Sequence, residues 1–125
     1  MDLITGGIYQ GKLDYAKKEY KLSDDMIFDC KGKSEIDFSK KCVNNTEEFV
    51  LWCVRNNISA SDYFEKNKSL WQDSVIIFRD IFCGVVPIEK EMRLWRDESG
   101  RLLRYLSENA DSVTRLFCGV PQKLK

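Results

Sequence analysis

The sequence contains no histidine. This absence excludes Ser-His-Asp and Cys-His nucleophile pairs, histidine metal sites, and phosphohistidine or nucleotidyl-histidine intermediates. No apolar run approaches the ~20 residues that a membrane helix needs. The first residues also lack the basic and then apolar pattern of a signal peptide. We therefore expect a cytoplasmic protein that has no membrane partner.

The sequence also lacks the cysteine pattern that a disulfide framework or a zinc site requires. The cysteines number five, which is odd, and no two of them form a C-x-x-C pair. We expect small, buried and reduced thiols at Cys30, Cys42, Cys53, Cys83 and Cys118. Lys+Arg and Asp+Glu number 20 each, so the net charge is zero and nothing indicates bulk attraction to nucleic acid.

The length of 125 residues and the hydrophobic content of 43 % suit a single domain, residues 1–125, with one core. Short apolar runs that alternate with helical patterns predict an α/β fold. We predict a three-layer domain of the P-loop type, in which helices flank a small and mostly parallel sheet. The predicted strands are 3–5, 26–30, 74–78 and 113–120, and the predicted helices are 13–20, 45–56, 59–71 and 88–109; residues 35–43 show no clear pattern.

Several single residues add detail to this prediction. Asn45 followed by Glu48 predicts a capping box at the start of the helix 45–56. Trp52 and Trp71 are expected to pack in the interior rather than to stack on nucleic acid bases. Gly100 interrupts the last predicted helix, which indicates close packing or a kink at that position.

The glycine-rich stretch 6–13 is the main candidate for a binding site. A strand pattern precedes it and a helix pattern follows it, which is the setting of a phosphate-binding loop. Its glycines allow backbone N–H groups to approach phosphate oxygens, and the positive end of the next helix points to the same place. The alternative is a plain strand–turn–helix corner. The expected nucleotide-binding residues are Gly6, Gly7, Ile8, Tyr9, Gln10, Gly11, Lys12 and Leu13.

Lys12 and Leu13 decide what such a loop can do. Gly6, four residues, Gly11 and Lys12 match the spacing G-x-x-x-x-G-K, and the Lys12 ammonium would reach the outer phosphates. The next position normally provides a hydroxyl group to magnesium, whereas Leu13 has no oxygen to offer. We therefore expect a phosphate cradle without its usual metal ligand, and we assign no residue as a metal ligand.

A second candidate position lies at the end of the continuous apolar run 74–78. Its β-branched residues predict a central strand that is covered on both faces. The run ends at Arg79 and Asp80. An acid at the carboxyl end of a buried strand lies where α/β proteins place ligand chemistry, so we expect Asp80 to belong to the site.

The C-terminal half of the chain contains a series of motifs in a specific order. A G-V-V-P loop at residues 84–87 precedes Arg93, Arg96-Asp97 and Gly100-Arg101, and Ala110-Asp111, Val113, Gly119 and Lys125 follow. Together with the opening residues 3–7 and Gly11-Lys12, these motifs resemble the adenosylcobinamide kinase / adenosylcobinamide-phosphate guanylyltransferase family of cobalamin biosynthesis. The resemblance implies a P-loop fold and a nucleotide ligand.

The chain departs from the family pattern at several positions. Leu13 replaces the serine of the loop, and Tyr9 and Gln10 replace its usual arginine and serine. Arg79 and Asp80 stand where the family has asparagine and glutamate, so the acid is kept. The middle of the chain is shorter than in family members, and the histidine there that accepts GMP is absent.

The resemblance implies GTP or ATP as the ligand, a weakly held Mg²⁺, a cobinamide-like substrate and a homo-oligomer. The function that we expect is nucleotide phosphate binding in which guanylyl transfer is absent and kinase activity is weak or lost.

Two alternatives remain open. In the first, the protein is an active kinase that moves a γ-phosphate to an alcohol such as the aminopropanol arm of cobinamide. Lys12 would then hold phosphates, Asp80 or Asp29 would hold magnesium or orient the hydroxyl, and Arg93 or Arg96 would neutralise developing charge. In the second, the protein is a non-catalytic interaction module, and the two arginines belong to a solvated helix face.

Overall fold

The computed structural model of the protein describes residues 1–81 and 89–125. The G-V-V-P motif at residues 84–87 and the thiol of Cys83 therefore lie outside the described residues.

Within the described residues, six strands form one sheet in the order β2-β3-β4-β1-β5-β6. β1 (Asp2–Gly6) lies between β4 (Val75–Arg79) and β5 (Ser112–Phe117) and pairs with both in parallel. β3 (Cys42–Asn44) pairs in parallel with β4 and with the edge strand β2 (Ile27–Asp29). Among the strands of residues 1–81 and 89–125, only β6 (Val120–Lys123) is antiparallel to its neighbour. The prediction of an α/β fold with a mostly parallel sheet is confirmed.

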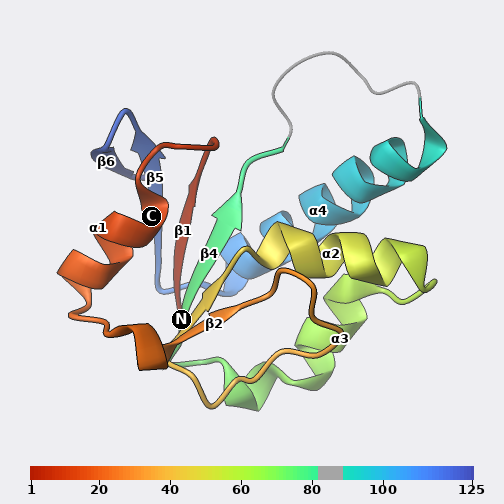
Figure 1. Ribbon diagram of the computed structural model, residues 1–125, viewed down its shortest axis with the longest axis horizontal. Coiled ribbons are helices and arrows are strands. Elements are labelled where there is room, and N and C mark those ends of the chain that lie inside the picture. Colours follow the sequence, from red (N-terminus) through yellow and green to blue (C-terminus); the bar gives the residue numbers. More distant parts are fainter. Residues whose placement is uncertain (82–88) are drawn as a thin grey trace.

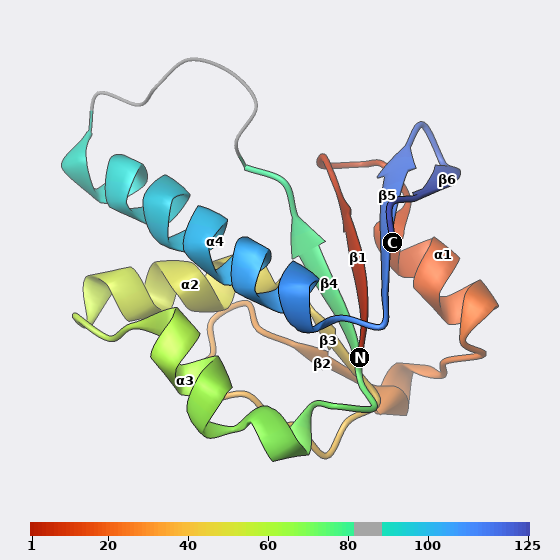
Figure 2. The same cartoon turned by 180° about the vertical axis from the view of Figure 1, so that it is seen from behind.

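Helices lie on both faces of this sheet (Figures 1 and 2). α1 (Lys12–Glu19) lies on one face, and α2 (Thr46–Arg55), α3 (Ala60–Lys66) and α4 (Lys90–Asn109) lie on the other. The domain therefore has the three layers that the sequence predicts. None of the helices in residues 1–81 and 89–125 combines the length and the apolar composition required to cross a lipid bilayer. Two short 3-10 turns lie at Asp24–Met26 and Lys68–Leu70.

Successive residues of the central strands point to opposite layers of helices. Leu3 and Ile76 pack in the cluster under α2, α3 and α4, whereas Ile4 and Ile77 pack in the cluster under α1. All four side chains are at most 1 % exposed. Because both faces of the strands are covered, the run 75–78 is apolar at every position rather than at alternate positions.

The two tryptophans that were expected to pack in the interior do so. Trp71 is fully buried, and its Nε1–H donates a hydrogen bond to the carbonyl of Phe64 at 2.8 Å. Trp52 is half-buried and stacks on Phe49 with the ring centroids 5.9 Å apart. These rings are part of the packing between the sheet and its larger helical layer.

The expectation of buried, reduced thiols is confirmed for three cysteines and wrong for one. Cys30, Cys42 and Cys53 are free and buried, and burial raises the pKa of the Cys42 and Cys53 thiols to about 12. These thiols therefore remain protonated at neutral pH. Cys118 is free but exposed, because it lies at a hairpin turn rather than inside a strand.

That hairpin corrects the prediction of one strand over residues 113–120. Cys118 and Gly119 have positive φ angles of 51° and 76°, so the chain reverses in a two-residue turn. β6 (Val120–Lys123) then pairs antiparallel with β5 along the edge of the sheet.

The unassigned stretch 35–43 runs into β3, whose three residues are too few to show a strand period. The helix α4 continues through Gly100, and close packing or a kink at this glycine stays a prediction.

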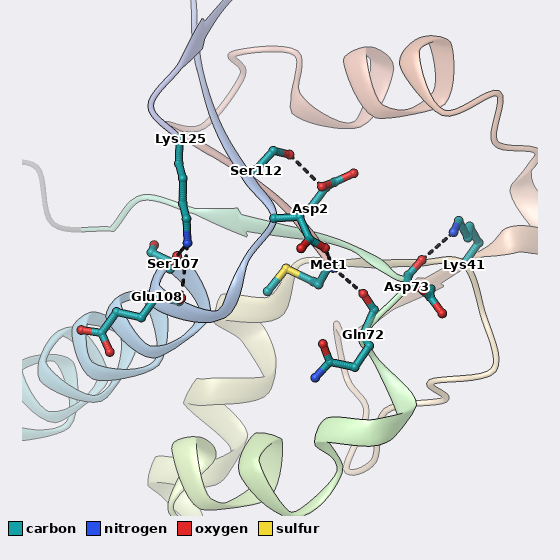
Figure 3. A network of polar contacts seen from close by, with 10 residues as sticks. Met1, Asp2, Lys41, Gln72, Asp73, Ser107, Glu108, Ser112 and Lys125 are labelled. Carbon is teal, nitrogen blue, oxygen red and sulfur yellow. Dashed lines mark hydrogen bonds and ion pairs between the residues drawn. The ribbon is translucent and has the colours of Figure 1, made fainter.

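Polar contacts hold the amino ends of the strands together, at the end of β1 opposite to the glycine loop (Figure 3). The amino group of Met1 donates hydrogen bonds to the carbonyl of Gln72 and, at 2.6 Å, to Oδ2 of Asp111. The Ser112 hydroxyl donates to Oδ1 of Asp2 at 2.8 Å. These contacts link the start of β1 to the start of β5.

A substitution at Gly6 tests the close approach at the other end of β1. Gly6 has a φ angle of 149°, and a Cβ atom there would lie 2.6 Å from the backbone oxygen of Leu116. We expect Gly6→Ala to lower the free energy of unfolding by ~2–4 kcal/mol, because backbone strain and a backbone clash add together.

Gly32→Ala is the matched control, because Gly32 has a φ angle of 72° but no atom within 4 Å of a built Cβ. It should cost only ~1 kcal/mol. Chemical denaturation measures both variants, and equal losses would contradict the close approach at Gly6.

Candidate functional site

The glycine loop connects the central strand β1 to α1 at the carboxyl end of the parallel strands (Figure 1). Gly6 ends β1 in register with Arg79 of β4 on one side and Leu116 of β5 on the other. Gly11 is the N-cap of α1, with a φ angle of 81° and no side-chain capping hydrogen bond. The first N–H groups of the helix therefore point toward the loop without a side-chain acceptor, a geometry that attracts anions.

Lys12, the first residue of α1, turns its side chain back into the loop. Its ammonium donates a hydrogen bond to the carbonyl of Gly7 at 2.6 Å. Partial burial lowers the pKa of Lys12; the charge of Arg79 acts in the same direction, and the carboxyl groups of Glu47 and Asp80 oppose it. Two cations, Lys12 and Arg79, and two acids, Glu47 and Asp80, therefore lie close to one another at this loop.

Among the remaining loop side chains, Gln10 makes a hydrogen bond, whereas Ile8 and Tyr9 are exposed to solvent. Oε1 of Gln10 accepts a hydrogen bond from the backbone N–H of Cys118, which links the loop to the β5–β6 hairpin. Tyr9 has a φ angle of 59°, which is uncommon for a bulky residue, and is 94 % exposed. Ile8 is also exposed. The tip of the loop thus presents two apolar side chains to solvent.

A first cleft of about 320 Å³ opens beside the loop. Leu13 lines this cleft and also packs against the apolar cluster under α1, which includes Ile4. The position that normally offers an oxygen to magnesium therefore makes an apolar contact here. The cleft is lined by Ile8, Tyr9, Gly11, Lys12, Leu13, Asp14, Lys31, Asn44, Asn45, Glu47, Glu48 and Arg79.

Glu47, near the start of α2, is a site residue that the sequence reasoning missed. Its side chain lines the first cleft and is 1 % exposed, and Oε1 accepts a hydrogen bond from the backbone N–H of Arg79 at 2.8 Å. Burial raises the pKa of this carboxyl group. An acid that follows a strand would have been the signal in the sequence, but β3 is too short to be predicted.

The predicted capping box at the start of α2 is wrong. Asn45 has a φ angle of 57° and makes no side-chain cap; its Nδ2 instead donates to Oδ1 of Asp29 at 2.8 Å. Asp29 ends β2, which lies three strands from β1 in the sheet, or ~14 Å at the usual strand spacing. Asp29 therefore joins β2 to the start of α2, and its role toward magnesium stays a prediction.

Arg79 is the second site residue that the sequence reasoning left without a role. It ends β4, beside Gly6, and lines clefts on both sides of the loop. Its guanidinium carbon lies 5.9 Å from the ring centroid of Trp95 in α4, within the range of a cation–π contact. The Trp95 Nε1–H in turn donates to the backbone carbonyl of Glu47 at 2.8 Å.

A second cleft, of about 480 Å³, lies on the other side of Arg79. Asp80 lines it, and its backbone N–H donates to the carbonyl of Gly6 at 2.8 Å. The predicted pair of Lys12 and Asp80 is therefore brought together at one loop. The residues of this cleft are Gly7, Ile8, Gln10, Arg79, Asp80, Ile81 and Trp95.

The predicted arginines of α4, Arg93 and Arg96, flank Trp95 in the sequence. Arg93 is exposed and Arg96 is half-buried, and neither lines one of the two clefts described above. A role of Arg93 or Arg96 toward phosphate charge stays a prediction.

The family of the chain follows from comparison with known sequences. The sequence profile of cobinamide kinase / cobinamide phosphate guanyltransferase matches residues 42–124. The chain belongs to this family. The matched range runs from β3 to β6 and includes Glu47, Arg79 and Asp80, whereas the glycine loop precedes it. No curated protein gives a match.

Membership of the cobinamide kinase / cobinamide phosphate guanyltransferase family implies a GTP or ATP ligand, commonly with Mg²⁺. The residues at the loop fit the nucleotide phosphates better than they fit the metal ion. Backbone amides, the α1 amino end and Lys12 suit phosphate oxygens. A magnesium ion fits poorly, because Leu13 offers no oxygen and residues 1–81 and 89–125 contain no group of three His, Cys, Asp or Glu side chains placed to hold a metal.

The raised pKa of Glu47 predicts a pH dependence of stability. The folded state binds the Glu47 proton more tightly than the unfolded state does, so the free energy of unfolding should fall as pH rises from the ordinary glutamate value of 4.5 through the raised folded value. Glu47→Gln keeps an oxygen that can accept from Arg79 and removes this titration. We expect Glu47→Gln to be more stable than the wild type on the alkaline side and to converge with it toward acid pH.

Denaturant titrations across pH measure this difference, with Glu48→Gln as the control on the same helix turn. Parallel curves for the wild type and Glu47→Gln would show that the buried carboxyl group does not titrate as described.

Proposed function

We propose that this protein binds the phosphates of GTP or ATP at the loop Gly6–Leu13, that guanylyl transfer is absent and that kinase activity is weak or lost. The observation that supports the proposal most directly is the side chain of Lys12, whose ammonium lies inside the loop, hydrogen-bonded to Gly7. A cation held against backbone groups at the carboxyl end of a central parallel strand is the arrangement that phosphate recognition requires.

The loop combines three sources of positive potential. Its glycines allow backbone N–H groups to approach an anion, the first turn of α1 adds its unpaired N–H groups, and Lys12 adds a full charge. The tie between Gln10 and the hairpin holds the loop in position. A ligand would therefore meet a largely formed site, which reduces the entropy lost on binding.

Weak or lost phosphoryl transfer follows from the lack of a metal ligand. A magnesium ion that bridges phosphates neutralises the charge that develops in phosphoryl transfer. Leu13 provides an apolar contact instead of a hydroxyl group. The absence of histidine removes the side chain that would accept GMP in the family, so guanylyl transfer through a histidine intermediate has no acceptor.

A second candidate function is an active kinase toward an alcohol on a cobinamide-like substrate. Asp80 favours this candidate, because it lines the second cleft with Gly7 and interacts with the charge of Lys12. In that case Asp80 would accept the proton of the attacking hydroxyl while Lys12 holds the phosphates. Turnover of GTP or ATP that rises on addition of cobinamide would support the kinase over the binding protein.

The binding proposal is tested by removing the loop cation. Calorimetry with GTP and ATP should give a dissociation constant at least tenfold weaker for Lys12→Ala, since a charge-assisted contact to phosphate contributes ~1.5–3 kcal/mol. Lys66→Ala, an exposed position on α3, makes the same change in net charge away from the loop and should bind as the wild type does. Equal affinities for all three proteins would contradict the assignment.

The role of Leu13 is tested by returning an oxygen to its position. Leu13→Ser should bind nucleotide more tightly in magnesium and should be little changed in EDTA, because serine adds a magnesium ligand. Leu13→Ala is the matched control, since it loses the same packing against the α1 cluster without gaining a hydroxyl. If serine and alanine behave alike in magnesium, the missing oxygen is not what limits metal binding.

A further inference from the structure

We propose that Arg79 acts with Lys12 as a metal-free clamp for the terminal phosphates, so that a nucleoside triphosphate or tripolyphosphate binds without magnesium. This inference rests on the proposed phosphate site and names the group that neutralises the ligand's charge there. The ligand class is a linear oligophosphate whose end faces the start of the loop.

The position of Arg79 favours this role. It is paired in register with Gly6, where the loop begins, and it lines both clefts that border the loop. The charges of Arg79 and Lys12 are close enough for Arg79 to lower the pKa of Lys12. Two cations, one at the end of β4 and one at the start of α1, therefore line the same cleft, and a multiply charged anion would relieve their mutual repulsion.

The guanidinium of Arg79 lies against Trp95, and the backbone of Arg79 is held by Glu47. Its carbon lies 5.9 Å from the ring centroid of Trp95, and the backbone N–H of Arg79 donates to Glu47 at 2.8 Å. Trp95 is fixed in turn by its own hydrogen bond of 2.8 Å to the backbone of Glu47. A side chain that is ordered in advance loses less entropy when it binds a ligand.

Acids and cations both line the first cleft: Lys12, Lys31 and Arg79 are the cations, and Asp14, Glu47 and Glu48 are the acids. One oxygen of the buried Glu47 already accepts a hydrogen bond from the backbone of Arg79, and Asp80 lies in the second cleft. Asp14 is exposed to solvent, where its charge is strongly screened.

Leu13 and Arg79 disfavour a magnesium ion beside Lys12. Leu13 contributes no oxygen to the first cleft, and of the acids there Glu47 already accepts a hydrogen bond from the backbone of Arg79. Mg²⁺ prefers carboxylates and phosphates in a near-octahedral shell. The guanidinium of Arg79 beside Lys12 would repel the ion, whereas its planar fork matches two phosphate oxygens.

The test compares binding with and without metal. Calorimetric titration of the full chain with tripolyphosphate and with GTP, each in EDTA and in magnesium chloride, should give equal or tighter binding in EDTA for the wild type. Arg79→Ala should weaken metal-free binding at least tenfold. The affinity of Arg79→Lys should lie between those of the wild type and Arg79→Ala, because lysine keeps the charge and loses the planar fork of the guanidinium. Arg104→Ala, at an exposed position of α4, controls for the loss of one positive charge.

Thermal unfolding monitored by circular dichroism identifies any variant that does not fold, and Arg79→Gln, which keeps most of the side-chain stem, then replaces alanine. Binding that requires magnesium, or that is the same in Arg79→Gln and the wild type, would overturn the clamp while leaving the phosphate site intact. An absence of binding in both solutions would overturn the clamp and the proposed function together.

Discussion

The close approach of Gly6 to the backbone of Leu116 constrains the start of the glycine loop. β1 is paired on both sides, and its last residue has no room for a side chain. The chain leaves the sheet at this point, between the ends of β4 and β5. The residues that border the loop therefore include some that are distant in sequence: Arg79 ends β4, Asp80 follows it, and Cys118 in the hairpin after β5 binds Gln10.

Sequence reasoning predicted the fold class, the central strands and the loop, because these depend on local signals. A continuous apolar run, glycine spacing and helix periodicity each extend over enough residues to be recognised. Glu47 could not be predicted in the same way, because its burial depends on β3, a strand of three residues. Arg79 has no distinctive local pattern, and its importance follows from its register with Gly6 and from Trp95, which lies on another helix.

Family membership and the individual side chains carry different information about this protein. The match over residues 42–124 shows the family. It does not determine the chemistry, because single side chains at strand and loop ends decide which charges face the clefts. Leu13 contacts the interior and offers no oxygen, and Arg79 places a cation beside the start of the loop.

The hydrogen bond between Gln10 and Cys118 joins the loop to the edge of the sheet. β6 is exposed at all four of its residues and pairs only with β5. Edge elements with few buried contacts open at lower free energy than the central strands do. Transient fraying of this hairpin would therefore release the loop while β1 and β4 stay folded. The order of the glycine loop thus depends on an exposed edge hairpin, and mutations near the C-terminus become able to change the loop without lying in it.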